Sequence, residues 1–202
     1  MSSKLLLGIV GALVLVLILG LWVGGTYNSL VRLDQATQSQ ASQVQNAYQR
    51  RADLVPNLVA TVKGAANFEQ STLTAVTEAR AKVGQITSGA VENIAENPQA
   101  FQRFEQAQAG LSSALSRLMV VVERYPELKA TQNFRDLQAS LESTENRISQ
   151  ERRKYNLAAQ EFNTRRDSFP TNLIAGFFGD KFKTKPYFQA QAGAERAPEV
   201  KF

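Results

Sequence analysis

The chain has 202 residues, with 23 Lys and Arg against 18 Asp and Glu, and it contains neither cysteine nor histidine. This composition excludes disulfides, thiolate or imidazole metal ligands, and nucleophilic mechanisms that use a Ser-His-Asp or Cys-His arrangement. The formal charge of +5 comes from the C-terminal quarter, because residues 147–202 hold 11 basic and 6 acidic residues. Such an end can meet nucleic acid or anionic lipid, although a solvated helix face followed by a tail is the favoured interpretation.

An apolar run opens the chain. Leu5 to Val23 is 19 residues without a charge, and at about 1.5 Å per residue it spans about 28 Å, close to the hydrocarbon thickness of a bilayer. A cleaved signal peptide has a shorter apolar region and a small-residue cleavage site, so we predict an uncleaved single-pass anchor that contacts lipid through Leu5–Val23. Lys4 on the N-terminal side favours a cytoplasmic N-terminus and an extracytoplasmic bundle.

The next segment has a helical apolar rhythm interrupted by a proline. Apolar or small residues recur at steps of three and four from Leu30 to Ile86, as in helices that pack at shallow angles. Pro56 removes a backbone donor, but the rhythm stays in phase across it and no polar turn cluster surrounds it. We therefore predict one long helix from the membrane to about residue 87, kinked at Pro56, with Asp53 capping its second half.

Two further long helices follow. Asn97-Pro98 is a typical helix start, and the helix that it opens ends at Tyr125-Pro126. A third helix begins near Thr131 or Asn133 and extends to Phe169. No segment has the pattern of a strand, so the predicted fold is all-α: an N-terminal transmembrane helix that continues into an antiparallel bundle with a short C-terminal helix.

Helix lengths place these elements relative to one another. A second helix that folds back from residue 87 reaches the level of about residue 60, which puts its terminal turn beside residues 50–57. The predicted structural junction consists of Arg50, Arg51, Asp53, Pro56, Asn57, Tyr125 and Pro126. The expected domains are an anchor (1–25), a helical stalk (26–52), a bundle (53–180) and a C-terminal tail (181–202). Residues 30–50 then lack a partner in the same chain, which indicates either self-association or a solvated spacer.

A short apolar segment rich in Phe and Gly, residues 169–179, follows the third helix, and three lysines come next. It could be a plug at the end of the bundle or an interfacial anchor that combines aromatic rings with lysines. One straight first helix would point it away from the membrane, which favours the plug. The candidate partner or membrane surface consists of Phe169, Phe177, Phe178, Lys181, Lys183 and Lys185.

Candidates for chemistry are few. The charged residues on the packing stripes are Arg51, Glu69, Glu151 and Arg165. A buried carboxylate could act as an acid or base, but an ion pair between helices is the favoured interpretation. Metal sites in bundles combine Glu with His, which is absent, and the chain has no Gly-rich phosphate loop. We predict no catalytic residue, metal ligand or cofactor, and no nucleic-acid partner, because Tyr155 and Phe162 belong to the packing stripe.

Several segments together resemble the LemA family of membrane-anchored proteins. They are Tyr27–Val31, Arg50–Val59, Val62–Gly64, Glu78–Arg80, Tyr125–Ala130, Thr144–Ile148, Tyr155-Asn156, Phe169–Ala175 and Lys185–Phe188. One departure is Asn67-Phe68-Glu69, where many members of the family have His-Glu. The resemblance implies a bacterial single-pass protein of the inner membrane with an antiparallel helical bundle, and it carries over no catalytic residues.

These observations favour a non-enzymatic, membrane-tethered helical scaffold that self-associates and organises the membrane or envelope. The alternative is a binding module or envelope sensor that recognises a peptide, protein or lipid in a groove near Pro56. An unknown protein partner fits either hypothesis.

Overall fold

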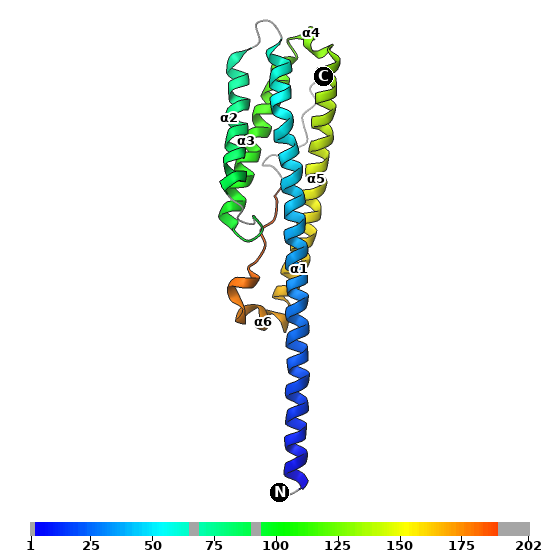
Figure 1. The fold of residues 1–202 in the computed structure, drawn as a ribbon. Coiled ribbons are helices and arrows are strands. Elements are labelled where there is room, and N and C mark those ends of the chain that lie inside the picture. Colours follow the sequence, from blue (N-terminus) through cyan, green and yellow to red (C-terminus); the bar gives the residue numbers. More distant parts are fainter. Residues whose placement is uncertain (1–2, 65–68, 90–93, 190–202) are drawn as a thin grey trace, which may run out of the picture.

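A computed structural model describes residues 3–64, 69–89 and 94–189 of the protein. Within these ranges the chain is helical and forms no strand, which confirms the all-α prediction (Figure 1). The helices are α1 (Ser3–Lys63), α2 (Gln70–Gly89), α3 (Pro98–Val122), α4 (Pro126–Lys129), α5 (Gln132–Asp167), α6 (Thr171–Phe177) and the 3-10 helix η1 (Gly179–Phe182).

The long helices form an antiparallel bundle around the upper part of α1. α2 returns alongside α1, α3 runs back up beside α2, and α5 descends along α1 to the base of the bundle (Figure 1). α1 packs mainly against α5, and α2 packs mainly against α3, so the bundle consists of two helix pairs. The short α6 and η1 lie at the base, beside α1.

α1 differs from the predicted first helix in where it ends. It is a continuous helix of 61 residues that includes Pro56, but it stops at Lys63, so the prediction of one helix to about residue 87 was wrong. Gly64 follows the last helical residue and has a low helix propensity. The rhythm stayed in phase because α1 and α2 turn their apolar stripes to the same core: Val55 and Leu58 pack in one cluster with Val76.

The backbone carbonyl that Pro56 leaves without a helical donor accepts a hydrogen bond from a side chain of α2. Proline has no N–H, so the Ala52 carbonyl four residues earlier receives no helical hydrogen bond from that position. The Nε–H of Arg80 on α2 donates to this carbonyl over 3.0 Å. Ala52 is buried, where an unpaired carbonyl would be costly. Arg80 therefore compensates for the proline and joins α2 to α1 at the same point. Asp53 lies exposed within α1 and does not cap a separate helix.

The stalk prediction also changes. Residues 30–50 were expected to lack a partner in the chain, but α5 is long enough to cover them, and that expectation was wrong. Leu30, Val44 and Tyr48 are buried. The lower half of α5 supplies Ile148, Tyr155 and Phe162 to the clusters that contain them. The predicted reason for self-association is therefore absent from this stripe.

The predicted helix starts are confirmed. The Asn97 side chain accepts hydrogen bonds from the backbone N–H groups of Gln99 and Ala100, with Pro98 at the first helical position of α3. The Thr131 side chain accepts from the N–H of Phe134 at the start of α5. Both caps satisfy donors that a helix end leaves free.

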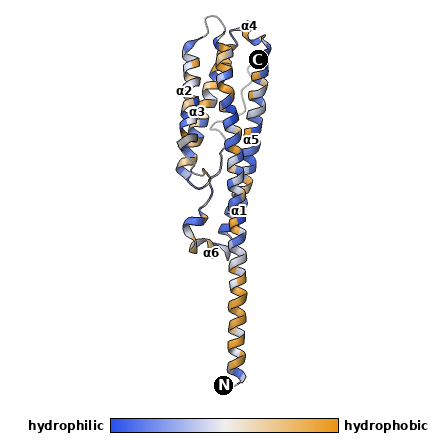
Figure 2. Cartoon of the chain, in the orientation of Figure 1, coloured by the Kyte–Doolittle hydropathy of each residue, from blue (hydrophilic) through white to orange (hydrophobic). Residues whose placement is uncertain are grey.

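The N-terminal part of α1 stands outside the bundle. α1 is long and apolar enough to cross a membrane, and within the described residues it is the one helix that meets this test of length and composition. Figure 2 shows this segment as a hydrophobic stretch, followed by a mixed surface where the bundle begins. Its side chains from Leu6 to Val23 are exposed, as lipid contact requires.

The contact between Arg80 and Ala52 can be tested by substitution. We expect Arg80→Met to lower the free energy of unfolding by about 1–2 kcal/mol, because the buried Ala52 carbonyl loses its donor. In a Pro56→Ala background, residue 56 supplies the missing N–H, so the same substitution should cost less. Urea unfolding of the detergent-solubilised chain, followed by circular dichroism, measures the four variants.

Lys82→Met, on the exposed side of α2, is the matched control and should change stability little. Equal costs for Arg80→Met in both backgrounds would show that Arg80 does not compensate for the proline.

Candidate functional site

The centre of the bundle contains a buried arginine. The side chain of Arg51 is 1% exposed. Its guanidinium donates to four acceptors: Ser112 Oγ at 2.6 Å, Glu145 Oε1 at 2.7 Å, and the backbone oxygen and Oε1 of Gln108 at 3.1 and 2.7 Å. It also lies 5.0 Å from the ring centroid of Tyr48. These contacts confirm the predicted ion pair between helices, and they join α1 to both α3 and α5.

The fork geometry explains why arginine occupies this position. A buried charge is costly unless it is paired and hydrogen-bonded, and a planar guanidinium can serve several acceptors at once. Glu145 is 48% exposed, so its carboxylate lies at the bundle surface while Arg51 lies beneath it. The pair is therefore open to solvent on one side only.

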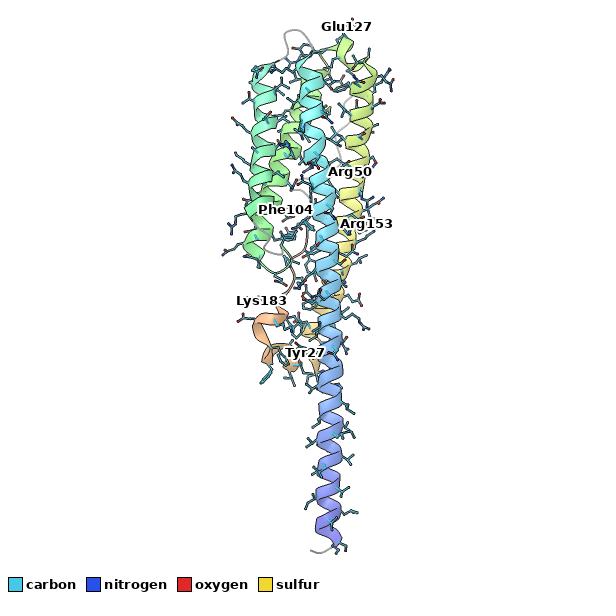
Figure 3. The ribbon with its side chains drawn as sticks, viewed as in Figure 1. Tyr27, Arg50, Phe104, Glu127, Arg153 and Lys183 are labelled. Atoms are coloured by element: carbon cyan, nitrogen blue, oxygen red, sulfur yellow. The ribbon has the colours of Figure 1, made fainter. Side chains whose placement is uncertain are left out.

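The predicted junction residues do not form one site. Arg50, Asp53, Pro56 and Asn57 are exposed on α1, and Asp53 accepts from Gln49 Nε2 at 2.8 Å. Tyr125 and Pro126 line a surface hollow with Thr61 and Gly64 at the tip of the bundle. Figure 3 shows Glu127, from the same turn, at the tip and well above Arg50. The turn lies higher than expected because α1 ends at Lys63 and the antiparallel α2 begins at Gln70, whereas one helix to residue 87 was predicted.

The other charged stripe residues divide in two. Glu151 is buried and pairs with Lys154 on the same helix, with 3.1 Å between Nζ and Oε1. Glu69 and Arg165, which were also predicted to lie on the packing stripes, are exposed. Within the described ranges, no group of three or more acidic side chains could hold a metal ion.

A groove opens on the side of the bundle where α3 faces α5. It has a volume of about 610 Å³. Leu115, Met119, Phe134 and Leu141 form an apolar floor, and the rim is polar. The rim residues include Ser112, Ser116, Gln138, Glu142, Glu145 and Asn146. An apolar floor with a polar rim is typical of a binding site.

A second hollow of about 290 Å³ lies directly below the groove. It shares Ser112 and Glu145 with the groove, and Arg51 forms part of its wall. Arg152 and Glu105 also line it, 3.9 Å apart between Nη2 and Oε1. Burial raises the pKa of the Glu105 carboxyl, and Arg152 lowers it in part. Burial likewise raises the pKa of Tyr48, so this hydroxyl is neutral at physiological pH.

The C-terminal segment 183–189 forms a strap along α5 that leads to this hollow. Asn163 donates to the carbonyl of Lys185 and accepts from its N–H, both at 2.9 Å. Asn156 makes the same pair of bonds with Phe188, at 2.8 and 2.9 Å. The two asparagines are seven residues apart, which places them on one face of α5. Each asparagine side chain thus pairs with both the N–H and the C=O of one strap residue.

Further contacts fix the ends of the strap. The Phe188 ring packs against Phe101 and Tyr155, with centroids 4.5 and 5.2 Å apart. The Tyr155 hydroxyl donates to the Pro186 carbonyl at 3.0 Å, and burial raises the pKa of this tyrosine. The Gln189 carbonyl accepts from Arg152 at 2.6 Å, and Gln189 lines the lower hollow.

The strap corrects the prediction for the chain end. Lys185 was expected on a membrane or partner surface, but its side chain is 1% exposed and its Nζ lies 2.5 Å from Asp34 Oδ1. Residues 181–189 are packed against the bundle and are not a separate tail, whereas residues 190–202 lie outside the described residues. Tyr155-Asn156 and Lys185–Phe188 stand apart in the sequence, so residue patterns did not indicate that they meet.

The buried arginine gives a stability prediction. We expect Arg51→Met to lower the free energy of unfolding by about 2–4 kcal/mol, since it leaves the buried Gln108 side-chain oxygen without this donor and Glu145 without its ion-pair partner. Arg51→Lys should recover only part of this loss, because an ammonium cannot form the same fork. Arg50→Met, at the exposed neighbouring position, is the control and should have an effect within about 0.5 kcal/mol. Similar losses at positions 50 and 51 in urea unfolding would contradict this role.

Comparison with known proteins agrees with this architecture. The sequence model of the LemA family matches residues 40–202. Magnetosome proteins MamQ 1 and MamQ 2 of Paramagnetospirillum magneticum are each 30% identical over 183 residues, which covers 84% of this chain and 66% of the relative. Protein LemA of Metamycoplasma hominis is 26% identical over 151 residues, or 75% of this chain and 64% of the relative. The matches thus span just under two thirds of these relatives, and the chain belongs to the LemA family.

Proposed function

We propose that the protein is a non-enzymatic scaffold of the bacterial inner membrane that holds an extended segment of a partner protein in the groove between α3 and α5. The observation that carries this proposal is the groove itself, which continues the line of the strap along α5. The bundle would organise the envelope by fixing that partner at a set height above the bilayer. Within the described residues, the central polar groups bind one another and brace the helices, which suits a binding role better than a reaction.

The strap supports an extended polypeptide as the occupant. The chain's own residues 183–189 already lie along α5, held by amides that each pair with one backbone N–H and one C=O. Above the strap, the exposed carboxamides of Gln138 and Asn146 line the groove. These groups can donate to and accept from a peptide backbone in the same way. Leu115, Met119 and Phe134 supply apolar contacts for its side chains.

The charges of the rim add a preference. Glu123, Glu142 and Glu145 line the groove with a single lysine, Lys129. Lys129 pairs with Glu123 and Arg51 pairs with Glu145. Glu142 adds a further negative charge on an exposed rim, which favours a partner segment with a basic residue.

Self-association remains a separate prediction. The stripe on residues 30–50 that motivated it is buried against α5. A homo-oligomer would therefore have to form through another surface.

Photo-crosslinking in intact cells tests the groove. A photo-reactive amino acid at Met119 on α3 or at Gln138 on α5 places a probe on each of the two helices that line the groove. We expect both probes to capture the same partner protein and their crosslinks to map within one short segment of it, because an extended chain in the groove contacts both helices. Val120, which is 65% exposed and lies outside the groove lining, is the matched control.

Three outcomes would contradict the proposal. Capture equal to that at Val120 would mean that the groove holds no specific segment. Crosslinks to residues 190–202 of the same chain would assign the groove to the protein's own C-terminal end. Crosslinks to a second copy would replace the partner by self-association.

The proposed topology places the N-terminus in the cytoplasm and the bundle outside it, because Lys4 precedes the apolar span. The chain lacks cysteine, so a single cysteine substitution can report the topology without labelling of any other site in the chain. Gln102 is exposed on α3. We expect Gln102→Cys to react with a membrane-impermeant maleimide in cells whose outer layers have been made permeable while the inner membrane is intact. Ser3→Cys should react only after the inner membrane is permeabilised, and the reverse pattern would place the bundle in the cytoplasm.

A further inference from the structure

The short helix α6 lies at the membrane end of the bundle. Tyr27 on α1, four residues after the apolar run ends at Val23, contacts the residues that follow α6. The Tyr27 ring lies 4.9 Å from Phe178 and 5.6 Å from Phe182, measured between centroids. Leu30 is fully buried in the same cluster as Ala175. Figures 1 and 2 show α6 beside α1, extending to one side of it just above the hydrophobic segment.

This position overturns the argument that favoured a plug far from the membrane. A single straight helix to residue 87 would have sent the C-terminal segment to the distal end. Because α1 ends at Lys63 and α2 reverses, α5 descends and ends at Asp167, close to the apolar span. The aromatic and basic segment therefore lies where a lipid headgroup layer would be.

α6 has two distinct faces. Thr171, Ile174 and Ala175 are buried toward the bundle. On the opposite face Leu173 and Phe177 are 63% and 85% exposed, and Phe169, two residues before the helix, is 79% exposed. These three large apolar side chains form the exposed stripe. Since the first face covers the base of the bundle, the stripe points away from it. Apolar groups in this number rarely face water without a partner.

Basic side chains flank the stripe. Lys181 donates to the Tyr27 hydroxyl and lies 4.9 Å from the centroid of that ring. Lys183 is exposed and pairs with Asp180 at 3.2 Å, a solvent-exposed contact of little strength. Arg165 is exposed at the end of α5, and Arg166 lies beside Asp167. Basic residues around an exposed apolar stripe are the usual pattern of an interfacial anchor on anionic lipid.

We propose that α6 docks in the membrane interface, with Phe169, Leu173 and Phe177 inserted at the boundary between headgroups and acyl chains, and with Lys181 and Lys183 facing anionic headgroups. The occupant of this surface is thus the bilayer that α1 crosses. Continuity with the apolar span and the local basic charge both favour lipid over a protein partner. The bundle then contacts the membrane at two points. The inference depends on α1 being a membrane anchor and is independent of the partner groove.

Tryptophan quenching measures this contact in the full chain. The protein has one tryptophan, Trp22, so a Trp22→Phe background is free of other indole signals. In that background Phe177→Trp places a probe on the stripe, and Val120→Trp, also an exposed apolar site but on α3, is the matched control. Each variant is reconstituted as a single copy per nanodisc that contains phosphatidylcholine and phosphatidylglycerol, with or without brominated acyl chains.

We expect the Phe177→Trp emission to shift to the blue and to be quenched by brominated lipid, whereas the Val120→Trp emission is unaffected. Emission from Phe177→Trp that matches the control would overturn the proposal. A blue shift without lipid quenching would assign the stripe to protein contact and would also overturn it.

The lysines have their own readout. Lys181→Gln with Lys183→Gln should reduce the quenching of Phe177→Trp in discs with phosphatidylglycerol to the level seen in phosphatidylcholine alone. Unchanged quenching in both lipids would remove the role of the lysines. Circular dichroism of each variant checks that the bundle is folded. All the substituted side chains are exposed, so we expect each variant to fold.

Discussion

The architecture depends on the continuity of α1 through Pro56. A proline within a helix removes a backbone bond and commonly kinks or ends the helix. Here the carbonyl that Pro56 leaves free accepts a hydrogen bond from Arg80 of the neighbouring helix, so the structural defect in α1 is also the point at which α2 attaches. Because α1 continues to Lys63, one helix extends from the membrane segment into the core of the bundle.

Arg51, one residue before Ala52, joins α1 to two further helices. Its guanidinium holds α3 and α5 at a set separation, since it bonds to Ser112 and Gln108 on one and to Glu145 on the other. α3 and α5 do not close on each other above this bridge, and the space between them is the groove. The groove therefore exists because a polar bridge replaces direct helix packing at this level. Its floor stays apolar because Leu115 and Phe134 belong to the upper core.

Local chemistry was predictable from the sequence, and the path of the chain was only partly so. Asn97 and Thr131 act as caps because a side-chain oxygen can reach the next N–H groups, and this depends on neighbours in sequence alone. The end of α1 was not predictable from periodicity, because two helices that face one core keep the same phase through a reversal. The burial of Lys185 was missed for a related reason, since its partner Asp34 is remote in sequence. Arg51 was correctly assigned to an ion pair, although its partners on α3 and α5 were not identified.

The stiffness of α1 links bilayer thickness to the height and direction of the bundle. From residue 24 to Lys63 the helix extends about 60 Å beyond the apolar run at about 1.5 Å per residue. Transmembrane helices tilt by about 20° on average, and a helix tilts further when its apolar stretch exceeds the hydrocarbon thickness. A 20° tilt of such a rod displaces its tip sideways by about 20 Å. Aromatic rings at the base that meet the lipid surface would oppose this swing on one side, so the molecule would lean in a preferred direction relative to the membrane normal.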